Sequence, residues 1–364
     1  MTDCMILRHP LPRRIAVFRA LNLGDLLCSI PALRVLRKAL PDAWIALVGL
    51  DSARPVVERF HRYLDELILF PGHSAFPEQA PRMAELPAFY RSMRSRRFDL
   101  VLQMHGSGAQ SNTVAQAMAA RDWAGFVPEA GQQEPGRLLA WPDDQPEVRR
   151  YLSLVSFMGL PEGSAELEFP LDRDDHVKAD ALAAQAGLDP RHSIFIHAGA
   201  RLESRRWPVE RFAAVAAALE REGWRIVITG NGDEGPLAQR LAAQLSSRAV
   251  NLCGKTSLGA LASLLQRSRL LICNDTGISH IAAALATPSV VIACGSDAAR
   301  WAPLDSDLHP VLHHSVPCRP CAYRQCPIGH VCAKAISVDQ VLAQATVQLH
   351  RGERLGSVGG GELP

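Results

Sequence analysis

Short apolar runs alternate with longer segments of helical spacing along most of the chain. An apolar run of about four to eight residues is typical of a strand buried on both faces, and strands separated by helices are typical of a parallel sheet. The runs predict strands at 14–19, 44–48, 66–70, 99–104, 193–197, 224–229, 248–252, 269–273 and 289–293. This alternation predicts an α/β protein.

Segments with apolar residues at every third or fourth position predict the helices that connect these strands. They lie at 25–40, 149–158, 208–222, 233–245, 258–266, 278–285 and 338–351. The first ends before Pro41, because proline cannot continue a helix. The last opens with Ser337 and Gln340, which have the spacing of a capping box.

The length and the breaks in this pattern predict two domains of similar size, since one domain takes about 150 residues. The expected division is an extension at 1–13, a Rossmann-like domain at 14–170, a linker at 171–190, a second Rossmann-like domain at 191–336, a C-terminal helix at 337–351 and a disordered, glycine-rich tail at 352–364. Ligands of such sheets usually bind at the carboxyl ends of the strands, so we expect the site in a cleft between the two sheets.

Composition narrows the function classes. Apolar residues make up 48% and charged residues 21% of the chain, which excludes a fully disordered protein. The net charge of +2 gives no global attraction to nucleic acid. No apolar run approaches the roughly 18 to 20 residues that span a bilayer, and the N-terminus lacks the order of a secretory signal. We therefore expect a cytoplasmic protein, whose nine cysteines are reduced thiols or metal ligands rather than disulfides.

The turn after the first predicted strand reads Asn22-Leu23-Gly24-Asp25 and leads into a helix. Gly24 permits a tight turn or a close approach to a ligand. Asp25 stands at the helix start, where it caps orphan amides or, in a site, takes a proton from an acceptor hydroxyl. Spacing alone does not separate the two roles.

The turn after the strand at 193–197 is basic. Arg201, Arg205 and Arg206 lie within six residues, just before a predicted helix start. Backbone amides and guanidinium groups together suit a diphosphate. The alternative is a solvated basic loop. Trp207, which follows, is interpreted as a packing residue.

Residues 230–235 fit the pattern G-x-G-x-x-G after a strand. A nicotinamide site is nevertheless rejected, because Asp233 and Glu234 put two negative charges where a pyrophosphate would lie, and Asn251 stands where an acidic ribose ligand is expected. Glu234 instead accepts hydrogen bonds from ribose hydroxyls or serves as a carboxylate in the first turn of a helix.

The sharpest local pattern is CNDTGISH at 273–280, in which a buried strand leads into a helix start. Thr276 and the amides near Gly277 suit phosphate oxygens. Asp275 either orients a sugar hydroxyl or caps the helix. His280, one turn further on, either donates to phosphate or packs in the interior.

Four cysteines near the end of the chain follow the spacing C-x2-C-x4-C-x5-C: Cys318, Cys321, Cys326 and Cys332. Thiolates at such short spacing are plausible ligands of zinc or iron. Because the spacing is not that of a standard finger, a bound metal is allowed by the pattern but is not favoured.

Four segments in this order resemble those of the family 9 glycosyltransferases, the heptosyltransferases of lipopolysaccharide core assembly. They are FRALNLGDLLCSIPALRVLRKALP, HAGARLESRRWPVERF, NDTGISHIAAAL and CRPCAYRQCPIGHVC, and the resemblance covers roughly 14–336. It implies the GT-B fold, with two Rossmann-like domains that have parallel sheets and face a central cleft. It further implies that the N-terminal domain takes the acceptor and that the C-terminal domain takes a nucleotide-sugar, typically ADP-heptose.

The resemblance also implies roles for single residues. Asp25 falls on the general base, with Asn22 and Gly24 on the acceptor side, and Glu234 falls on the ribose-binding position. Arg205 stands where the family commonly has lysine, and an arginine keeps the charge while changing its geometry. Gly199 and Ala200 stand where hydroxyl residues are frequent, so only backbone amides act there. The donor-binding residues implied are Gly199, Arg201, Arg205, Glu234, Asp275, Thr276, Gly277 and His280.

The implied reaction is an inverting displacement in which Asp25 removes the proton of the acceptor hydroxyl and ADP leaves. No cofactor is required, and no divalent ion if protein donors hold the diphosphate. The implied partners are a nucleotide-sugar donor, a lipid-linked or other glycan acceptor and, transiently, the inner-membrane surface. Two alternatives stay open: a GT-B nucleotide-sugar epimerase, and a non-catalytic protein that binds glycan or nucleotide.

Overall fold

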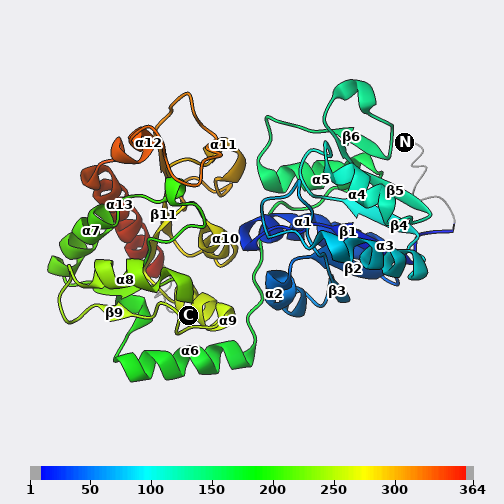
Figure 1. Cartoon of the computed structure of the whole chain (residues 1–364). Helices are drawn as coiled ribbons and strands as arrows, with labels where there is room; N and C mark the ends of the chain where they lie inside the picture. The colour runs from blue at the N-terminus through cyan, green and yellow to red at the C-terminus, as the bar shows by residue number, and fades with distance from the viewer. Residues whose placement is uncertain (1–9, 358–364) are drawn as a thin grey trace. The chain divides into compact units, whose positions relative to one another are not determined.

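The computed structural model describes residues 10–357 and divides the chain into two compact units, Met1–Leu167 and Glu168–Pro364. Each unit contains one six-stranded sheet in which neighbouring strands are parallel (Figure 1). The predicted α/β class with two Rossmann-like domains is confirmed. Among the described helices, none combines the length and the apolar character needed to cross a membrane.

In unit 1 the strands pair in the order β3-β2-β1-β4-β5-β6. They are β1 (Arg14–Phe18), β2 (Trp44–Gly49), β3 (Glu66–Leu69), β4 (Leu100–Gln103), β5 (Asp122–Val127) and β6 (Leu138–Ala140). The helices are α1 (Leu23–Ala39), α2 (Arg54–Arg59), α3 (Leu86–Ser95), α4 (Ser111–Ala117) and α5 (Glu147–Phe157). Helix α5 packs against α1 (Figure 1), and this contact brings residues near 150 close to the start of α1.

In unit 2 the strands pair in the order β12-β11-β10-β7-β8-β9. They are β7 (Ser193–His197), β8 (Arg225–Ile228), β9 (Val250–Asn251), β10 (Leu270–Asn274), β11 (Ser289–Ala293) and β12 (Val311–His313). The helices are α6 (Arg173–Ala186), α7 (Val209–Arg221), α8 (Gly235–Ala242), α9 (Leu258–Gln266), α10 (Gly277–Ala284), α11 (Ala298–Trp301), α12 (Val331–Lys334) and α13 (Val338–Ser357). Helix α13, at the red end of the colour scale, packs against α7, β10 and β11.

Both sheets have the same topology, and it fixes where a ligand would lie. In unit 1 the chain moves outward from β1 through β2 to β3 and then returns to add β4 on the other side of β1. In unit 2 it moves from β7 through β8 to β9 and returns to add β10 beside β7. Ligands of such sheets bind at the carboxyl ends of the strands where this order reverses. The expected places are therefore the ends of β1 and β4 and the ends of β7 and β10.

The predicted strands agree with observed ones to within two residues, whereas β5, β6 and β12 were not predicted. Strands β6 and β12 are three-residue edge strands, too short to show a period. Strand β5 contains Gly125, where a Cβ would lie 2.7 Å from the Gln103 side chain. A glycine required by such close packing looks like a turn signal when only the sequence is read.

Two predicted boundaries differ from the structure. Residues 171–190, predicted as a linker, contain α6, which packs against α9 and belongs to unit 2. Its start is fixed by Asp172, whose side chain accepts from the Asp175 amide at 2.8 Å. Helix α13 continues to Ser357, so 352–357 are helical rather than disordered. The rest of the predicted tail, and residues 1–9 of the predicted extension, lie outside the described residues.

Candidate active site

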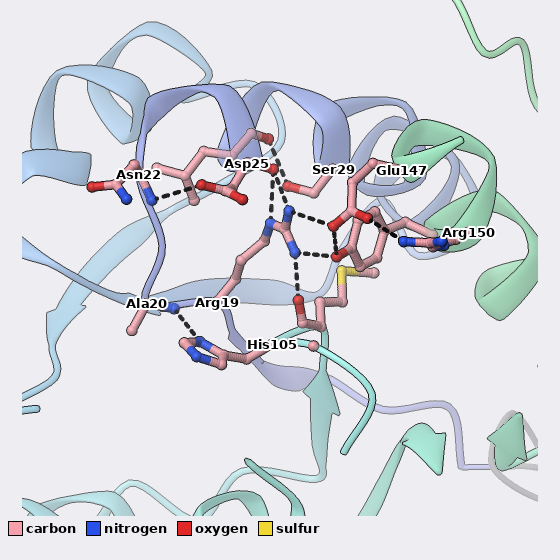
Figure 2. Close-up of polar contacts among 12 residues, drawn as sticks. Arg19, Ala20, Asn22, Asp25, Ser29, His105, Glu147 and Arg150 are labelled. Atoms are coloured by element: carbon pink, nitrogen blue, oxygen red, sulfur yellow. Dashed lines mark hydrogen bonds and ion pairs between the residues drawn. The ribbon is translucent and has the colours of Figure 1, made fainter. Parts of the chain in front are cut away.

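Asp25 lies in the first turn of α1, the helix that follows β1 after a short loop. Its Oδ2 accepts a hydrogen bond from the backbone amide of Asn22, the N-cap residue, at 3.2 Å (Figure 2). Asp25 therefore closes a capping box, and the structural role that its spacing allowed is present. Since an ionised carboxylate accepts several hydrogen bonds, this contact is compatible with a further role as a base.

Beneath this turn lies the fully buried guanidinium of Arg19. Its Nε and Nη2 both donate to the backbone carbonyl of Asp25, and its Nη1 donates to the carbonyl of Met104, the first residue after β4 (Figure 2). One side chain thus joins the two turns that follow β1 and β4. These are the turns at which the topology places a ligand.

The charge of Arg19 is balanced by a buried carboxylate from α5. Glu147, 1% exposed, has Oε1 at 3.5 Å from Arg19 Nη2 and Oε2 at 3.0 Å from Arg150 Nη1, and its Oε1 accepts from the Tyr151 hydroxyl at 2.5 Å. Burial alone would lower the pKa of Arg19, but Tyr151, Glu147 and Asp25 outweigh it and raise that pKa. The guanidinium therefore stays charged and paired.

His105 stands at the other side of the same turn. It is 7% exposed, its Nδ1 accepts from the Ala20 amide at 3.2 Å, and its ring lies 5.0 Å from Phe18 and 4.4 Å from Phe76. Burial, helped by the charge of Arg19, lowers the pKa of His105 to about 3. The ring is thus neutral, with its hydrogen on Nε2.

In unit 2 the turn that follows β7 is held by a buried amide. Asn274, the last residue of β10, donates from Nδ2 to the Ala198 carbonyl at 2.7 Å and accepts at Oδ1 from the Trp207 amide at 2.9 Å. Trp207 is buried and donates from Nε1 to the Ile336 carbonyl at 3.1 Å, so its predicted packing role is confirmed. The ends of β7 and β10 are therefore joined directly.

Gly199 and Glu234 lie against each other at this edge. A Cβ on Gly199 would lie 1.8 Å from Glu234 Oε1, so any larger residue at 199 would require the Glu234 carboxylate to move. Glu234 Oε2 accepts from the Asn231 amide at 2.9 Å, which gives Glu234 the first-turn role foreseen as an alternative. The same oxygen lies 3.8 Å from Nε2 of His197, whose pKa is lowered by burial against the attraction of the carboxylate.

The segment after β10 begins α10 at Gly277. Thr276 is the N-cap, so the alternative role of Asp275 as the cap is wrong, and Asp275 stands one residue earlier, half-buried. His280 is 4% exposed, and its ring centre lies 6.4 Å from that of Trp301. Because β7 and β10 pair in parallel up to Cys273 and His197, the turn with Gly199 and the start of α10 share one edge of the sheet.

The basic turn places its arginines differently. Arg201 is exposed, whereas Arg205 is half-buried at the end of a short 3-10 helix, Glu203–Arg205. Arg205 Nη2 lies 3.5 Å from the carbonyl of Cys321, in the segment that carries the cysteines. The guanidinium of Arg205 is thus held near the end of β11, whose next-but-one residue, Gly295, would place a Cβ 3.7 Å from Arg205 Cγ.

Within residues 10–357 no group of three or more histidine, cysteine or acidic side chains is arranged to hold a metal ion. Burial raises the pKa of the Cys332 thiol, and the nearby Cys318 and Cys326 raise it further. Three of the four cysteines of the motif, Cys318, Cys326 and Cys332, therefore lie near one another, and within the described residues they form no metal-binding group.

Comparison with known proteins agrees with this architecture. Residues 87–332 match glycosyltransferase family 9 (heptosyltransferase), which is more than half of the chain. The chain belongs to glycosyltransferase family 9. It is thus a glycosyltransferase, and the resemblance noted in the sequence is confirmed. The matched residues include those at the ends of β4, β7 and β10 but not Asp25.

Single relatives of this glycosyltransferase cover most of its length. Lipopolysaccharide heptosyltransferase 2 of Salmonella typhimurium is 26% identical over 306 residues, which cover 80% of this chain and 83% of that protein. A glycosyltransferase of family 9 from Veillonella parvula superposes with a TM-score of 0.76 at 23% identity, covering 93% of this chain and 98% of that one. The E. coli ADP-heptose lipopolysaccharide heptosyltransferase II superposes with a TM-score of 0.70 at 20% identity, covering 93% and 99%. These neighbours confirm the GT-B fold.

Sequence reasoning missed Arg19, Glu147 and His105 in this glycosyltransferase. Arg19 and Glu147 are 128 positions apart in the chain, and only the packing of α5 on α1 brings them together. A signal for His105 was present, because a histidine at the end of a predicted strand is followed by two glycines, both at positive φ. A residue at the end of a strand next to a sharp turn of this kind is a candidate for a site.

We expect Glu147→Gln to destabilise unit 1 by about 3 kcal/mol, because it leaves two buried guanidinium groups without their counter-charge. The matched control is Glu134→Gln. Glu134 also pairs with an arginine three residues further on at 3.0 Å, but its side chain is 53% exposed, so its loss should cost less than about 1 kcal/mol. Urea unfolding measures both, and equal effects would contradict a stabilising role for the buried pair.

The lowered pKa of His105 predicts a loss of stability in mild acid. The unfolded state takes up a proton near pH 6.5, whereas the folded state does so only near pH 3, so stability is lost as pH falls below about 6.5. Between pH 6.5 and 5 this residue should account for about 2 kcal/mol. Urea unfolding of the wild type and of His105→Gln at both pH values isolates it, since other groups titrate equally in both proteins. Parallel pH profiles would show that His105 is not held neutral.

Proposed function

We propose that this glycosyltransferase moves a heptose from ADP-heptose to a hydroxyl of a lipopolysaccharide-core acceptor, with inversion at the anomeric carbon. Its relatives are named for heptose transfer to lipopolysaccharide, and one of them for the ADP-heptose donor. The observation that carries the proposal is the placement of the motif residues: Asp25 lies at the reversal point of the first sheet, and Gly199, Glu234 and Asp275 lie at that of the second.

In this proposal the donor binds unit 2 at the ends of β7 and β10. Glu234 accepts from the ribose hydroxyls, and its neighbour Gly199 offers only backbone, so the nucleotide can approach closely. The guanidinium groups of Arg201 and Arg205 donate to the diphosphate. At the start of α10, the Thr276 hydroxyl and the backbone amides near Gly277 donate to phosphate oxygens. Asp275 accepts from a sugar hydroxyl. His280, one turn further along the helix, completes the donor site.

The chemical step makes one bond and breaks one. Asp25 takes the proton of the acceptor hydroxyl, whose oxygen attacks the anomeric carbon, and the bond from that carbon to the phosphate oxygen breaks with its electron pair going to ADP. The N-terminus of α1 and the charge of Arg19 favour a negative charge on Asp25 before it acts. Preorganised donors such as Arg205 stabilise the leaving diphosphate, at about 3 to 4 kcal/mol for one well-placed group.

The acceptor side is proposed to include Asn22 and Gly24, whose backbone shapes the turn before Asp25. Transfer needs no divalent ion in this scheme. Whether the four cysteines bind a metal is a separate question, which elemental analysis of the purified protein tests. A lipid-linked acceptor requires transient contact with the inner-membrane surface, on the cytoplasmic side where the nucleotide-sugar is available.

Product analysis with ADP-heptose, with and without a lipid acceptor, tests the proposal. Acceptor-dependent release of ADP together with a glycosylated lipid supports transfer. Release of free sugar or of an epimer without acceptor would instead indicate an epimerase, and binding of the donor without its consumption would indicate a non-catalytic protein. Either outcome contradicts the proposal.

We expect Asp25→Asn to lower the rate of transfer at least about a hundredfold, the scale of a lost general base. Its affinity for ADP should stay unchanged in calorimetry, because the donor is held by unit 2. Asp51→Asn is the control, since Asp51 is also a first-turn aspartate of unit 1 but is 77% exposed and pairs with Arg54. Near-normal turnover of Asp25→Asn would remove it as the base.

We expect Arg205→Ala to weaken ADP binding about tenfold or more, as the loss of a charge-assisted hydrogen bond does. Arg240→Ala, which removes a 63% exposed arginine of the same unit, should leave the affinity unchanged. Calorimetry with ADP measures both variants. Equal affinities in Arg205→Ala and the wild type would count against contact with the diphosphate.

A further inference from the structure

The cysteine segment, residues 318–332, has no role in the scheme above, yet it contacts the turn that carries Arg205. Ser204, 2% exposed, is the residue through which it does so. The Ser204 amide donates to the Arg324 carbonyl at 3.1 Å, and its hydroxyl donates to the Tyr323 carbonyl at 2.6 Å. The Ser204 carbonyl lies 2.8 Å from Nε2 of His330, which donates to it. All three polar groups of Ser204 are thus bonded to one segment.

The neighbours of Ser204 are bonded to the same segment. Gln325 donates to the Glu203 carboxylate at 3.0 Å, and Arg205 Nη2 lies 3.5 Å from the Cys321 carbonyl. The Glu203–Arg205 turn therefore rests on the cysteine segment at each of its three residues. The basic turn as a whole is fixed to the core at its other end, where Asn274 holds Trp207.

The cysteine segment is itself anchored to the rigid end of β11. The Cys321 amide donates to the Gly295 carbonyl at 2.7 Å, and the Arg319 guanidinium donates to the carbonyls of Ala293 and Ser296. A Cβ on Gly295 would lie 2.8 Å from that of Cys321, so the two backbone segments approach each other as closely as a glycine allows. The contacts thus run without a break from the sheet through Cys321 to Ser204.

His330 reaches Ser204 only through an unusual backbone. Its φ is +59°, in the left-handed region, and it follows Gly329 at φ +82°. A non-glycine residue in this conformation costs about 1 to 2 kcal/mol and is found where other contacts compensate for it. Here the compensation comes from the ring contact with the Ser204 carbonyl and from the His330 amide, which donates to Cys326 Sγ at 3.2 Å.

We infer that the cysteine segment acts as a brace for the donor site, and that Ser204 and His330 are positioning residues for Arg205. This inference rests on the proposed role of Arg205 at the diphosphate. An arginine on an unrestrained turn loses conformational freedom when it binds, and a turn already held in place lowers that cost. The brace should therefore act on donor affinity and leave proton removal by Asp25 unaffected.

The test is a double-mutant cycle on the full-length protein. His330→Asn keeps a residue that tolerates positive φ but is too short to reach Ser204, and Ser204→Ala removes only the hydroxyl. Each should raise the Kd for ADP about three- to tenfold and the KM for ADP-heptose by a similar factor, and each should also lower kcat, because Arg205 stabilises the leaving diphosphate. In the Arg205→Ala background the same substitutions should have no further effect on the Kd, since they act through that side chain.

His350→Asn, an exposed histidine on α13, is the control and should leave all three constants unchanged. An effect of His330→Asn that persists undiminished in Arg205→Ala would overturn the inference, as would unchanged ADP affinity in both single variants when Arg205→Ala alone weakens binding. If the wild type does not bind ADP, or Arg205→Ala binds it normally, the proposed function fails instead. Thermal unfolding of each variant shows that the fold is retained, and Ser204→Ala covers the case in which His330→Asn unfolds.

Discussion

The buried guanidinium of Arg19 is the constraint on which unit 1 depends. A charge without solvent must be paired and must have its hydrogens accepted, or the folded state loses several kcal/mol. Arg19 satisfies this with the carbonyls of the two turns at the reversal point and with Glu147 from α5. The requirement therefore couples three distant parts of the chain, and the position of Asp25 follows from it because its own carbonyl is one of the acceptors.

In unit 2 the two strand ends at the reversal point are also joined by one buried side chain, but this side chain is neutral. Asn274 joins the ends of β7 and β10 through two hydrogen bonds and carries no charge. A neutral amide suits the place where an anionic diphosphate is proposed to bind, since the cationic groups there can remain on the surface of the turn. In unit 1 the positive charge lies beneath the carboxylate and stabilises it. The two reversal points share a topology and differ in the sign of the charge that each favours.

Much of the fold was readable from the sequence because buried parallel strands are continuous apolar runs. The runs at 193–197 and 269–273 therefore predicted β7 and β10 to within one residue, while the short edge strands β6 and β12 gave no signal. The motif positions around Asp25 and Asp275 could be found because their signal is local. The Arg19–Glu147 pair could not, because a polar residue at the end of a strand looks solvent-exposed until the partner from α5 is known. Contacts of Ser204 with the cysteine segment were hidden for the same reason, since they join residues more than a hundred positions apart.

The overlap between Gly199 and Glu234 links the chemistry allowed at two positions. With the Glu234 oxygen in its present place, any side chain at 199 would occupy the volume that the carboxylate now fills. A serine or threonine there therefore requires the acidic group to withdraw from the strand end. Substitutions at 199 and 234 should thus be accepted only in compatible pairs. With glycine at 199 the protein has no side-chain hydroxyl there, and the Glu234 carboxylate lies closer to the backbone instead.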